Sequence, residues 1–171
     1  MEDNSRPADP NAMLDRLLDA TNRHDLDALV DCFAPDYENQ TPAHPARGFR
    51  GQAQVRRNWE QIFAHVPDIA ATVLRRVSDH DTVWSEWEMR GRRRDGSAHL
   101  MRGVILFGVR EGRASWARFY LEPVEAAGGD VNEAVQRAVA PATPRAPGAP
   151  GAPGAPGAPS APSAARSADA R

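Results

Sequence analysis

The chain has 171 residues, its 21 basic residues are all arginine, and its 23 acidic residues give a formal net charge of −2. This balance argues against nucleic acid as a main partner, because nucleic-acid-binding domains carry a clear basic excess. No apolar run approaches the about 20 residues of a membrane span, and residues 1–12 lack the basic-then-apolar order of a secretory signal. We therefore expect a cytoplasmic protein with no membrane or nucleic-acid partner.

Composition divides the chain into three parts. Residues 1–11 are polar and predict a flexible N-terminus, whereas residues 12–127 contain enough apolar side chains for one domain. Residues 128–171 hold 8 of the 15 prolines and a repeated Gly-Ala-Pro unit. Such a segment has too little apolar bulk to offset the entropy lost on ordering, so we predict a disordered tail of polyproline-II character.

Apolar residues at helical spacing predict three helices in the first half of the domain. The first covers residues 11–23, the second runs from Leu26 towards Pro35, and the third covers residues 51–66. Between the second and third helices, residues 37–41 have extended character and are followed by a loop that contains prolines.

After Pro67 the apolar period changes from helical to alternating, which predicts four strands. They cover Ile69–Val77, Thr82–Arg92, Ala98–Val109 and Ala114–Pro123. Short turns join them as an antiparallel meander, since an Asp-Gly pair between two such runs favours a hairpin. Helices followed by a meander indicate an α+β fold in which the helices cover one face of a curved sheet.

Six short sequence words stand in a fixed order along the domain: Asp25-Leu26-Asp27-Ala28-Leu29, Phe33-Ala34-Pro35-Asp36-Tyr37, Phe49-Arg50-Gly51, Glu86-Trp87, Arg102-Gly103-Val104 and Glu111-Gly112-Arg113. Over about residues 12–125, this order resembles the SnoaL-like branch of the NTF2-like superfamily. The resemblance implies a cone-shaped NTF2-like (cystatin-like) barrel, a homodimer, and an apolar cavity for a small molecule. Members include polyketide cyclases, ketosteroid isomerases and epoxide hydrolases.

The catalytic residues of ketosteroid isomerases do not carry over to this sequence. Their carboxylate base matches Asn39, and their two oxyanion donors fall near Leu17 and Gly103. An amide cannot accept a proton at neutral pH, and neither Leu17 nor Gly103 has a side-chain donor. The resemblance therefore gives no support for steroid-type isomerisation.

Limonene-type epoxide hydrolases hold a water with a Tyr-x-Asn pair, which Tyr37-Glu38-Asn39 reproduces. Their Asp-Arg-Asp trio would fall near Met89, Trp87 and Arg118, so both carboxylates are missing. Without them the mechanism lacks its acid and its base. An epoxide-hydrolase-like activity is therefore kept only as a minor alternative.

The alternation of inward and outward side chains along a strand predicts two catalytic residues on the last strand. With Trp87 pointing inward on its own strand, the same parity places Trp116, Arg118 and Tyr120 inward. An arginine there can receive an anionic or carbonyl oxygen, and a tyrosine can donate beside it. We predict Arg118 and Tyr120 as catalytic residues, with a structural pairing of Arg118 with Glu122 as the equal alternative.

The predicted ligand contacts combine a polar pair with aromatic and sulfur-containing walls: Tyr37, Asn39, Trp59, Phe63, Trp87, Met89, Met101 and Trp116. Local backbone bonds for the polar pair, and core packing for the other side chains, are the open alternatives. His44 lies in a loop that often closes the pocket mouth in this family, although a solvated loop histidine is the plainer interpretation.

No metal or cofactor is expected, because the five histidines show no ligand spacing and no phosphate-binding glycine loop is present. The favoured function is the binding of a small, largely apolar, oxygen-bearing molecule, with chemistry of the polyketide cyclase or isomerase type. The alternative is a non-catalytic dimerisation or ligand-binding module whose pocket is filled by its own side chains.

Overall fold

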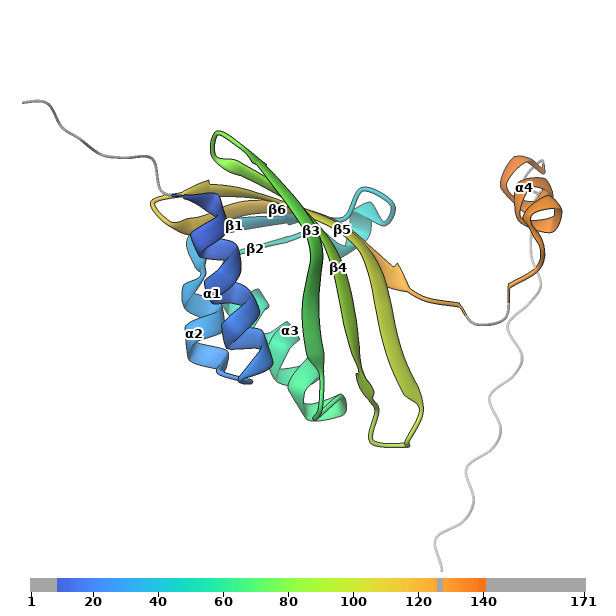
Figure 1. The fold of residues 1–171 in the computed structure, drawn as a ribbon, viewed down its shortest axis with the longest axis horizontal. Helices are drawn as coiled ribbons and strands as arrows, with labels where there is room; N and C mark the ends of the chain where they lie inside the picture. The colour runs from blue at the N-terminus through green and yellow to red at the C-terminus, as the bar shows by residue number, and fades with distance from the viewer. Residues whose placement is uncertain (1–8, 126–127, 141–171) are drawn as a thin grey trace, which may run out of the picture. The chain divides into compact units, whose positions relative to one another are not determined.

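The computed structural model describes residues 9–125 and 128–140. The chain divides into two units after Ala127, which are described separately. The described part of the first unit contains helices on a six-stranded sheet (Figure 1). In chain order its elements are α1 (Pro10–Asn22), α2 (Leu26–Asp31), β1 (Phe33–Gln40), the 3₁₀ turn η1 (Pro45–Arg47), β2 (Phe49–Arg50), α3 (Gln52–His65), β3 (Ala70–Asp79), β4 (Thr82–Arg92), β5 (Ala98–Arg110) and β6 (Arg113–Pro123).

The first two helices begin where capping chemistry predicts. The Asp9 carboxylate accepts a hydrogen bond from the Asn11 amide over 2.9 Å, and Pro10 occupies the first turn of α1. Asp25 caps α2 by accepting from the Ala28 amide over 3.0 Å. The three predicted helices and the four meander strands are confirmed, with ends that differ by a few residues.

The junction of α2 and β1 differs from the prediction. α2 ends at Asp31 and the chain enters β1 at Phe33, instead of remaining helical towards Pro35. β1 pairs in parallel with β6, where Phe33 lies opposite Ala114, and the Gln52 side chain donates to the Phe33 carbonyl over 2.7 Å. These partners are remote in sequence, so local spacing does not reveal them.

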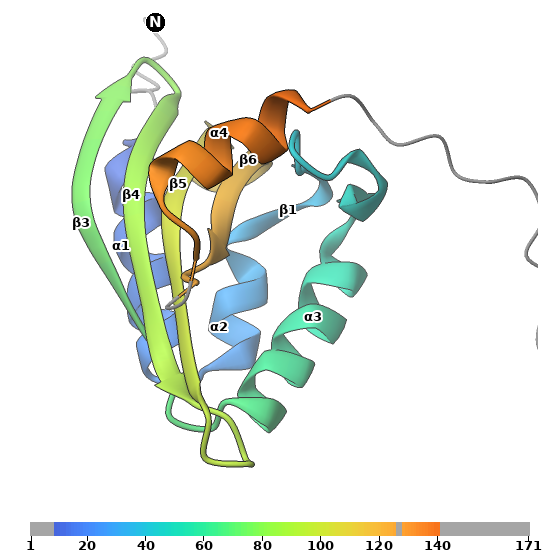
Figure 2. The same cartoon turned by 90° about the vertical axis from the view of Figure 1, so that its right-hand side faces the viewer.

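The sheet has the order β2-β1-β6-β5-β4-β3, and every neighbouring pair is antiparallel except β1 and β6. The two-residue strand β2, which the sequence did not predict, forms one edge. In both views the sheet curves, and α1, α2 and α3 lie on its concave side (Figures 1 and 2). The predicted α+β architecture, with helices covering one face of a curved sheet, is confirmed.

A glycine in β5 permits a close approach between two strands of this curved sheet. Gly103 has a φ of +154°, and a Cβ at this position would lie 2.0 Å from the carbonyl oxygen of Tyr120 on β6. No larger residue fits there without a shift of the backbone. The Arg102-Gly103-Val104 word therefore has a steric origin.

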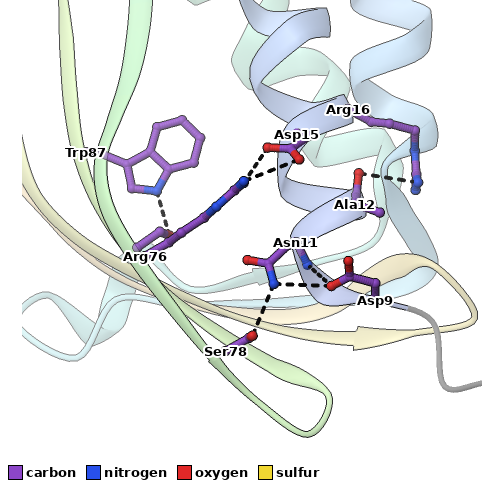
Figure 3. A network of polar contacts seen from close by, with 9 residues as sticks. Asp9, Asn11, Ala12, Asp15, Arg16, Arg76, Ser78 and Trp87 are labelled. Atoms are coloured by element: carbon purple, nitrogen blue, oxygen red, sulfur yellow. Dashed lines mark hydrogen bonds and ion pairs between the residues drawn. The ribbon is translucent and has the colours of Figure 1, made fainter.

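Polar side chains attach α1 to the edge strand β3. Near the start of the helix, Asp15 forms an ion pair with Arg76 (Figure 3). At its end, the Asn22 side chain accepts from the Ala71 amide over 2.8 Å and donates to the Ala71 carbonyl over 3.0 Å. Asn22 thus satisfies both backbone groups of a residue that has no strand neighbour on that side.

The second unit contains the helix α4 (Val131–Val139). The Asp130 carboxylate caps it by accepting from the amides of Asn132 and Glu133 over 2.8 and 3.0 Å. These nine residues form an exposed helix within the segment for which the sequence predicts disorder. The Gly-Ala-Pro repeat and residues 1–8 lie outside the described residues.

Candidate functional site

A cavity of about 290 Å³ lies between α1, α3 and the concave face of the sheet. Its wall is mainly apolar: Leu17, Phe33, Phe49, Val55, Trp59, Ile62, Trp87, Met89, Met101, Ile105, Phe107, Phe119 and Leu121. Its polar lining consists of Thr21, Tyr37, Asn39, Thr41, Arg47, Asn58 and Glu122. Arg47 is exposed and Glu122 half-buried, so these two mark the mouth. An apolar cavity with a few convergent polar groups is the usual form of a small-molecule site.

Two neighbouring inward positions of β1 form a polar pair in this cavity. The Tyr37 side chain is 1% exposed, and its hydroxyl donates to Asn39 Oδ1 over 3.1 Å. Burial raises the pKa of Tyr37 far above its usual value, so the phenol remains a neutral donor. Both predicted residues therefore line the cavity, and the hydrogen bond between them sets the orientation of the Asn39 amide.

The other half of the Asn39 amide is available to a ligand. Asn39 Nδ2 forms no hydrogen bond with a described residue. In the described ranges, every side-chain nitrogen or oxygen that is fully enclosed has a hydrogen-bond partner. Asn39 lines this cavity and also a second, open groove, and its parity is that of Tyr37, which lies on the cavity side of β1. At this point the wall offers a hydrogen-bond donor.

Trp87 forms part of the apolar wall of the cavity, although its indole ring carries one polar group, the N–H. Its indole nitrogen donates to Ser85 Oγ over 2.8 Å, and that hydroxyl donates to the Ile105 carbonyl over 2.8 Å. The indole proton is thus used inside the protein, and the ring presents only carbon to the cavity. The predicted inward parity of β4, including Met89, is confirmed.

The mouth brings together a histidine and a carboxylate from remote parts of the chain. His44, in the loop before η1, lies with Nε2 3.1 Å from Glu122 Oε1 on β6. The Thr41 hydroxyl donates to the His44 carbonyl over 2.9 Å and holds the loop turn. From the sequence, His44 is either a residue of the pocket mouth or, more plainly, a solvated loop histidine. Glu122 is predicted only as an alternative partner of Arg118.

The predicted inward parity of β6 is wrong. Ala117 is fully buried and Phe119 and Leu121 line the cavity, so the residues between them face the other side of the sheet. There, Arg118 Nε donates to Gln40 Oε1 over 2.8 Å rather than pairing with Glu122. The predicted catalytic residues therefore do not lie in the cavity.

Trp116, Arg118 and Tyr120 lie on the outer face of the sheet instead of in the cavity. The Arg118 guanidinium lies 5.6 Å from the centre of the Trp116 ring, and Tyr120 is 44% exposed. Arg118 and Tyr120 line a separate, open groove of about 670 Å³, together with the ion pair of Glu38 and Arg50, which are 2.7 Å apart.

Phe63 is the other predicted contact that is not in the cavity lining. Its ring packs against Trp59, with ring centres 5.4 Å apart, and against His24 at 4.8 Å. The remaining predicted contacts, namely Tyr37, Asn39, Trp59, Trp87, Met89 and Met101, do line it. No cluster of three or more metal-ligating side chains occurs in the part of the chain that the structure describes, nor does any helix there have the length and apolarity to cross a membrane.

Solved structures with the same fold include enzymes and ligand complexes. IdmH of Streptomyces antibioticus, a candidate polyketide cyclase, is 24% identical over 66% of this chain and 91% of its own, with a TM-score of 0.58. Its loop-truncation variant is 26% identical over 67% and 93%, with a TM-score of 0.57. An LEH-like epoxide hydrolase from Mycobacterium tuberculosis is 16% identical over 66% of this chain and 82% of its own, with a TM-score of 0.58.

A further Mycobacterium tuberculosis protein, RV0760c, solved in complex with estradiol-17beta-hemisuccinate, is 18% identical over 67% of this chain and 92% of its own, with a TM-score of 0.57. No curated protein sequence matches the chain significantly. The fold is that of ketosteroid isomerase-like and NTF2-like proteins, as predicted. The family model described as the SnoaL-like domain matches residues 14–117, which is more than half of the chain. The protein therefore belongs to the SnoaL-like domain family.

Proposed function

We propose that the cavity binds a small, largely apolar molecule that carries a carbonyl or similar oxygen. The observation that carries the proposal is the Asn39 amide, which Tyr37 holds through Oδ1 and whose Nδ2 donor has no partner among the described residues of a mainly apolar lining. Burial of the apolar body supplies the affinity, and the Asn39 donor contributes to the orientation of the ligand. The ligand-bound form of the same fold in RV0760c supports such a use of the cavity.

We further propose chemistry of the polyketide cyclase or isomerase type, with Glu122 as the base. Glu122 has the outward parity of Arg118 and Tyr120, but it stands near the end of β6 and is one of the residues that line the cavity. Its carboxylate Oε1 lies 3.1 Å from His44 Nε2. Glu122 would take the proton from the carbon next to a bound carbonyl, and the Asn39 amide would stabilise the oxygen of the resulting enolate. Delivery of this proton from Glu122 to a different carbon of a conjugated enolate completes an isomerisation. Attack of the enolate carbon on a second carbonyl of the same molecule forms the new C–C bond of a cyclisation, and the alkoxide so formed takes the proton back from Glu122.

The same lining is a poor fit for the two alternatives. Among the described residues Glu122 is the only acidic one in the lining, whereas epoxide hydrolysis of the limonene type needs two carboxylates. The filled-pocket module requires that Trp59, Phe63, Trp87 and Trp116 pack on one another. Only Phe63 and Trp59 do so, whereas Trp59 and Trp87 line the cavity and Trp116 packs against Gly108. These observations favour a ligand-binding site over a purely structural role.

The binding test uses 2-acetylnaphthalene, an apolar aromatic ketone, and isothermal titration calorimetry. We expect Asn39→Leu to weaken binding about tenfold, in line with one hydrogen bond lost from a largely dry site. Gln40→Leu is the matched control, because this neighbouring residue faces the outer groove. Arg118→Ala should also leave the affinity unchanged. Equal affinities of the wild type and Asn39→Leu would contradict the proposed site.

The catalytic test follows exchange of the methyl protons of the bound ketone with deuterated water by NMR. The wild type should accelerate this exchange and Glu122→Gln should not, since an amide cannot take the proton. Exchange that continues at the wild-type rate in Glu122→Gln would rule out this residue as the base.

A homodimer and a cytoplasmic location remain predictions from the sequence. Exposed apolar side chains on the outer face of the sheet, including Val77, Trp84 and Tyr120, support an interface there. Light scattering coupled to size-exclusion chromatography measures the mass directly, and a monomer at micromolar concentration would contradict the dimer.

A further inference from the structure

The mouth of the cavity carries an arginine that has no partner among the described residues. Within residues 9–125, the guanidinium of every arginine except Arg47 and Arg92 forms a hydrogen bond or an ion pair with another described residue. Arg92 ends β4, at the turn to β5, whereas Arg47 lines the cavity. A guanidinium that is left open beside an apolar cavity suits a planar pair of anionic oxygens.

The acidic residue of the lining does not neutralise Arg47. Glu122 is engaged by His44, and it forms no ion pair with Arg47 in the described part of the chain. The loop from Thr41 to Gly48 thus contributes an imidazole that faces the carboxylate of β6, and a guanidinium that remains free. The Arg47 guanidinium is therefore open to an anionic group of a ligand at the mouth.

The interior of the cavity cannot accept such a charge. Its polar groups are neutral side chains, and the Asn39 amide is the donor that the described contacts leave open in the β1 wall. Moving a carboxylate from water into an apolar interior is costly unless a cation accompanies it. A charged end of a ligand therefore belongs at the mouth, where Arg47 is exposed to solvent.

We propose that the natural ligand is an apolar carboxylic acid, whose carboxylate is bound by Arg47 while its apolar body fills the cavity. This inference rests on the proposed function, since it names the class of molecule that the same cavity takes. Arg47 acts here as a binding and specificity residue, and it has no part in the proton transfer assigned to Glu122.

The test compares 2-naphthoate with its uncharged methyl ester by isothermal titration calorimetry on the full chain at low ionic strength. We expect the wild type to bind the acid about three- to tenfold more tightly than the ester, as for a charge-assisted contact at a partly exposed site. Arg47→Gln should bind the two molecules equally. Arg92→Gln is the matched control, because it removes the same charge from the other unpartnered arginine, and it should keep the preference for the acid.

The outcomes separate this inference from the proposed function. If the wild type binds acid and ester equally, and Arg47→Gln changes neither affinity, the proposal that Arg47 binds a carboxylate is overturned. The proposal that the cavity binds an apolar ligand is then retained. If Arg92→Gln loses the preference as fully as Arg47→Gln, the effect comes from net charge and the assignment is again overturned. If neither molecule binds to the wild type, both proposals fail.

Discussion

The indole of Trp116 on β6 lies across Gly108 on β5, so closely that a Cβ at Gly108 would be 1.9 Å from Trp116 Nε1. The two residues are opposite each other in the β5–β6 pairing, just before the register shift that follows Gly108. Because Gly108 has no side chain, the Trp116 ring fits against β5 on the outer face, the face to which its position on β6 turns it. This contact explains why the largest side chain of β6 is not part of the cavity.

Substitution of this glycine should destabilise the domain through overpacking. Gly108→Ala is expected to lower the free energy of unfolding by about 1–3 kcal/mol, because the indole or the strand must move. Chemical denaturation measures the loss. In a Trp116→Ala background the same substitution should cost much less, and an undiminished cost there would show that the clash is not the cause.

The Asn22 side chain should contribute measurably to stability, since it serves both backbone groups of Ala71. We expect Asn22→Ala to lower the free energy of unfolding by about 1–2 kcal/mol. Asn22→Asp keeps the acceptor for the Ala71 amide but sets a carboxylate oxygen against the Ala71 carbonyl, so at neutral pH its loss should be at least as large. Amide hydrogen exchange gives a second measurement: the Ala71 amide should lose protection in Asn22→Ala and keep it in the wild type.

Glu88 should make stability dependent on acid pH. This carboxylate is 7% exposed on the outer face, where Arg102 Nε donates to it over 2.8 Å and Arg90 lies 2.5 Å away. The hydrogen bond from Arg102, reinforced by both positive charges, lowers the pKa of Glu88 below its usual 4.5. A carboxyl group with a lowered pKa in the folded state stabilises the protein above its unfolded pKa, and this stabilisation is lost as the pH falls through the folded pKa.

Thermal unfolding between about pH 6 and about pH 2 tests this dependence. The melting temperature of Glu88→Gln should fall less steeply with acid than that of the wild type. Glu86→Gln is the control on the same strand, because this half-exposed carboxylate lies no closer than 4.0 Å to Arg75. Identical slopes for Glu88→Gln and the wild type would show that the ion pairs of Glu88 with Arg90 and Arg102 have no part in acid unfolding.

Cys32 should be unreactive in the folded protein. The thiol is 3% exposed and donates to the Ala28 carbonyl over 3.3 Å. Burial raises the pKa of this thiol, and the thiolate is the reactive form. We expect an aromatic disulfide reagent to label Cys32 only after unfolding in concentrated guanidinium chloride. Rapid labelling of the native protein would indicate that α2 opens readily.

Local sequence signals were sufficient where the chain follows a local rule. Asp9 and Asp25 identify the starts of the first two helices, because a cap needs only residues two or three positions away. The alternation around Trp87 gives the correct inward face of β4 for the same reason. The Tyr37–Asn39 pair also follows from sequence, since positions two apart on one strand share a face.

What the sequence by itself determined is therefore the α+β class, the order of the predicted helices and meander strands, and one polar pair of the cavity. The tertiary structure decided which face of β6 is buried, and it brought His44 and Arg47 to the same mouth as Glu122. Both outcomes depend on partners remote in the chain: the bare Gly108 surface that receives Trp116, and the loop that reaches β6. Periodicity carries no information about such partners, because they are chosen by steric fit and pairing across the fold.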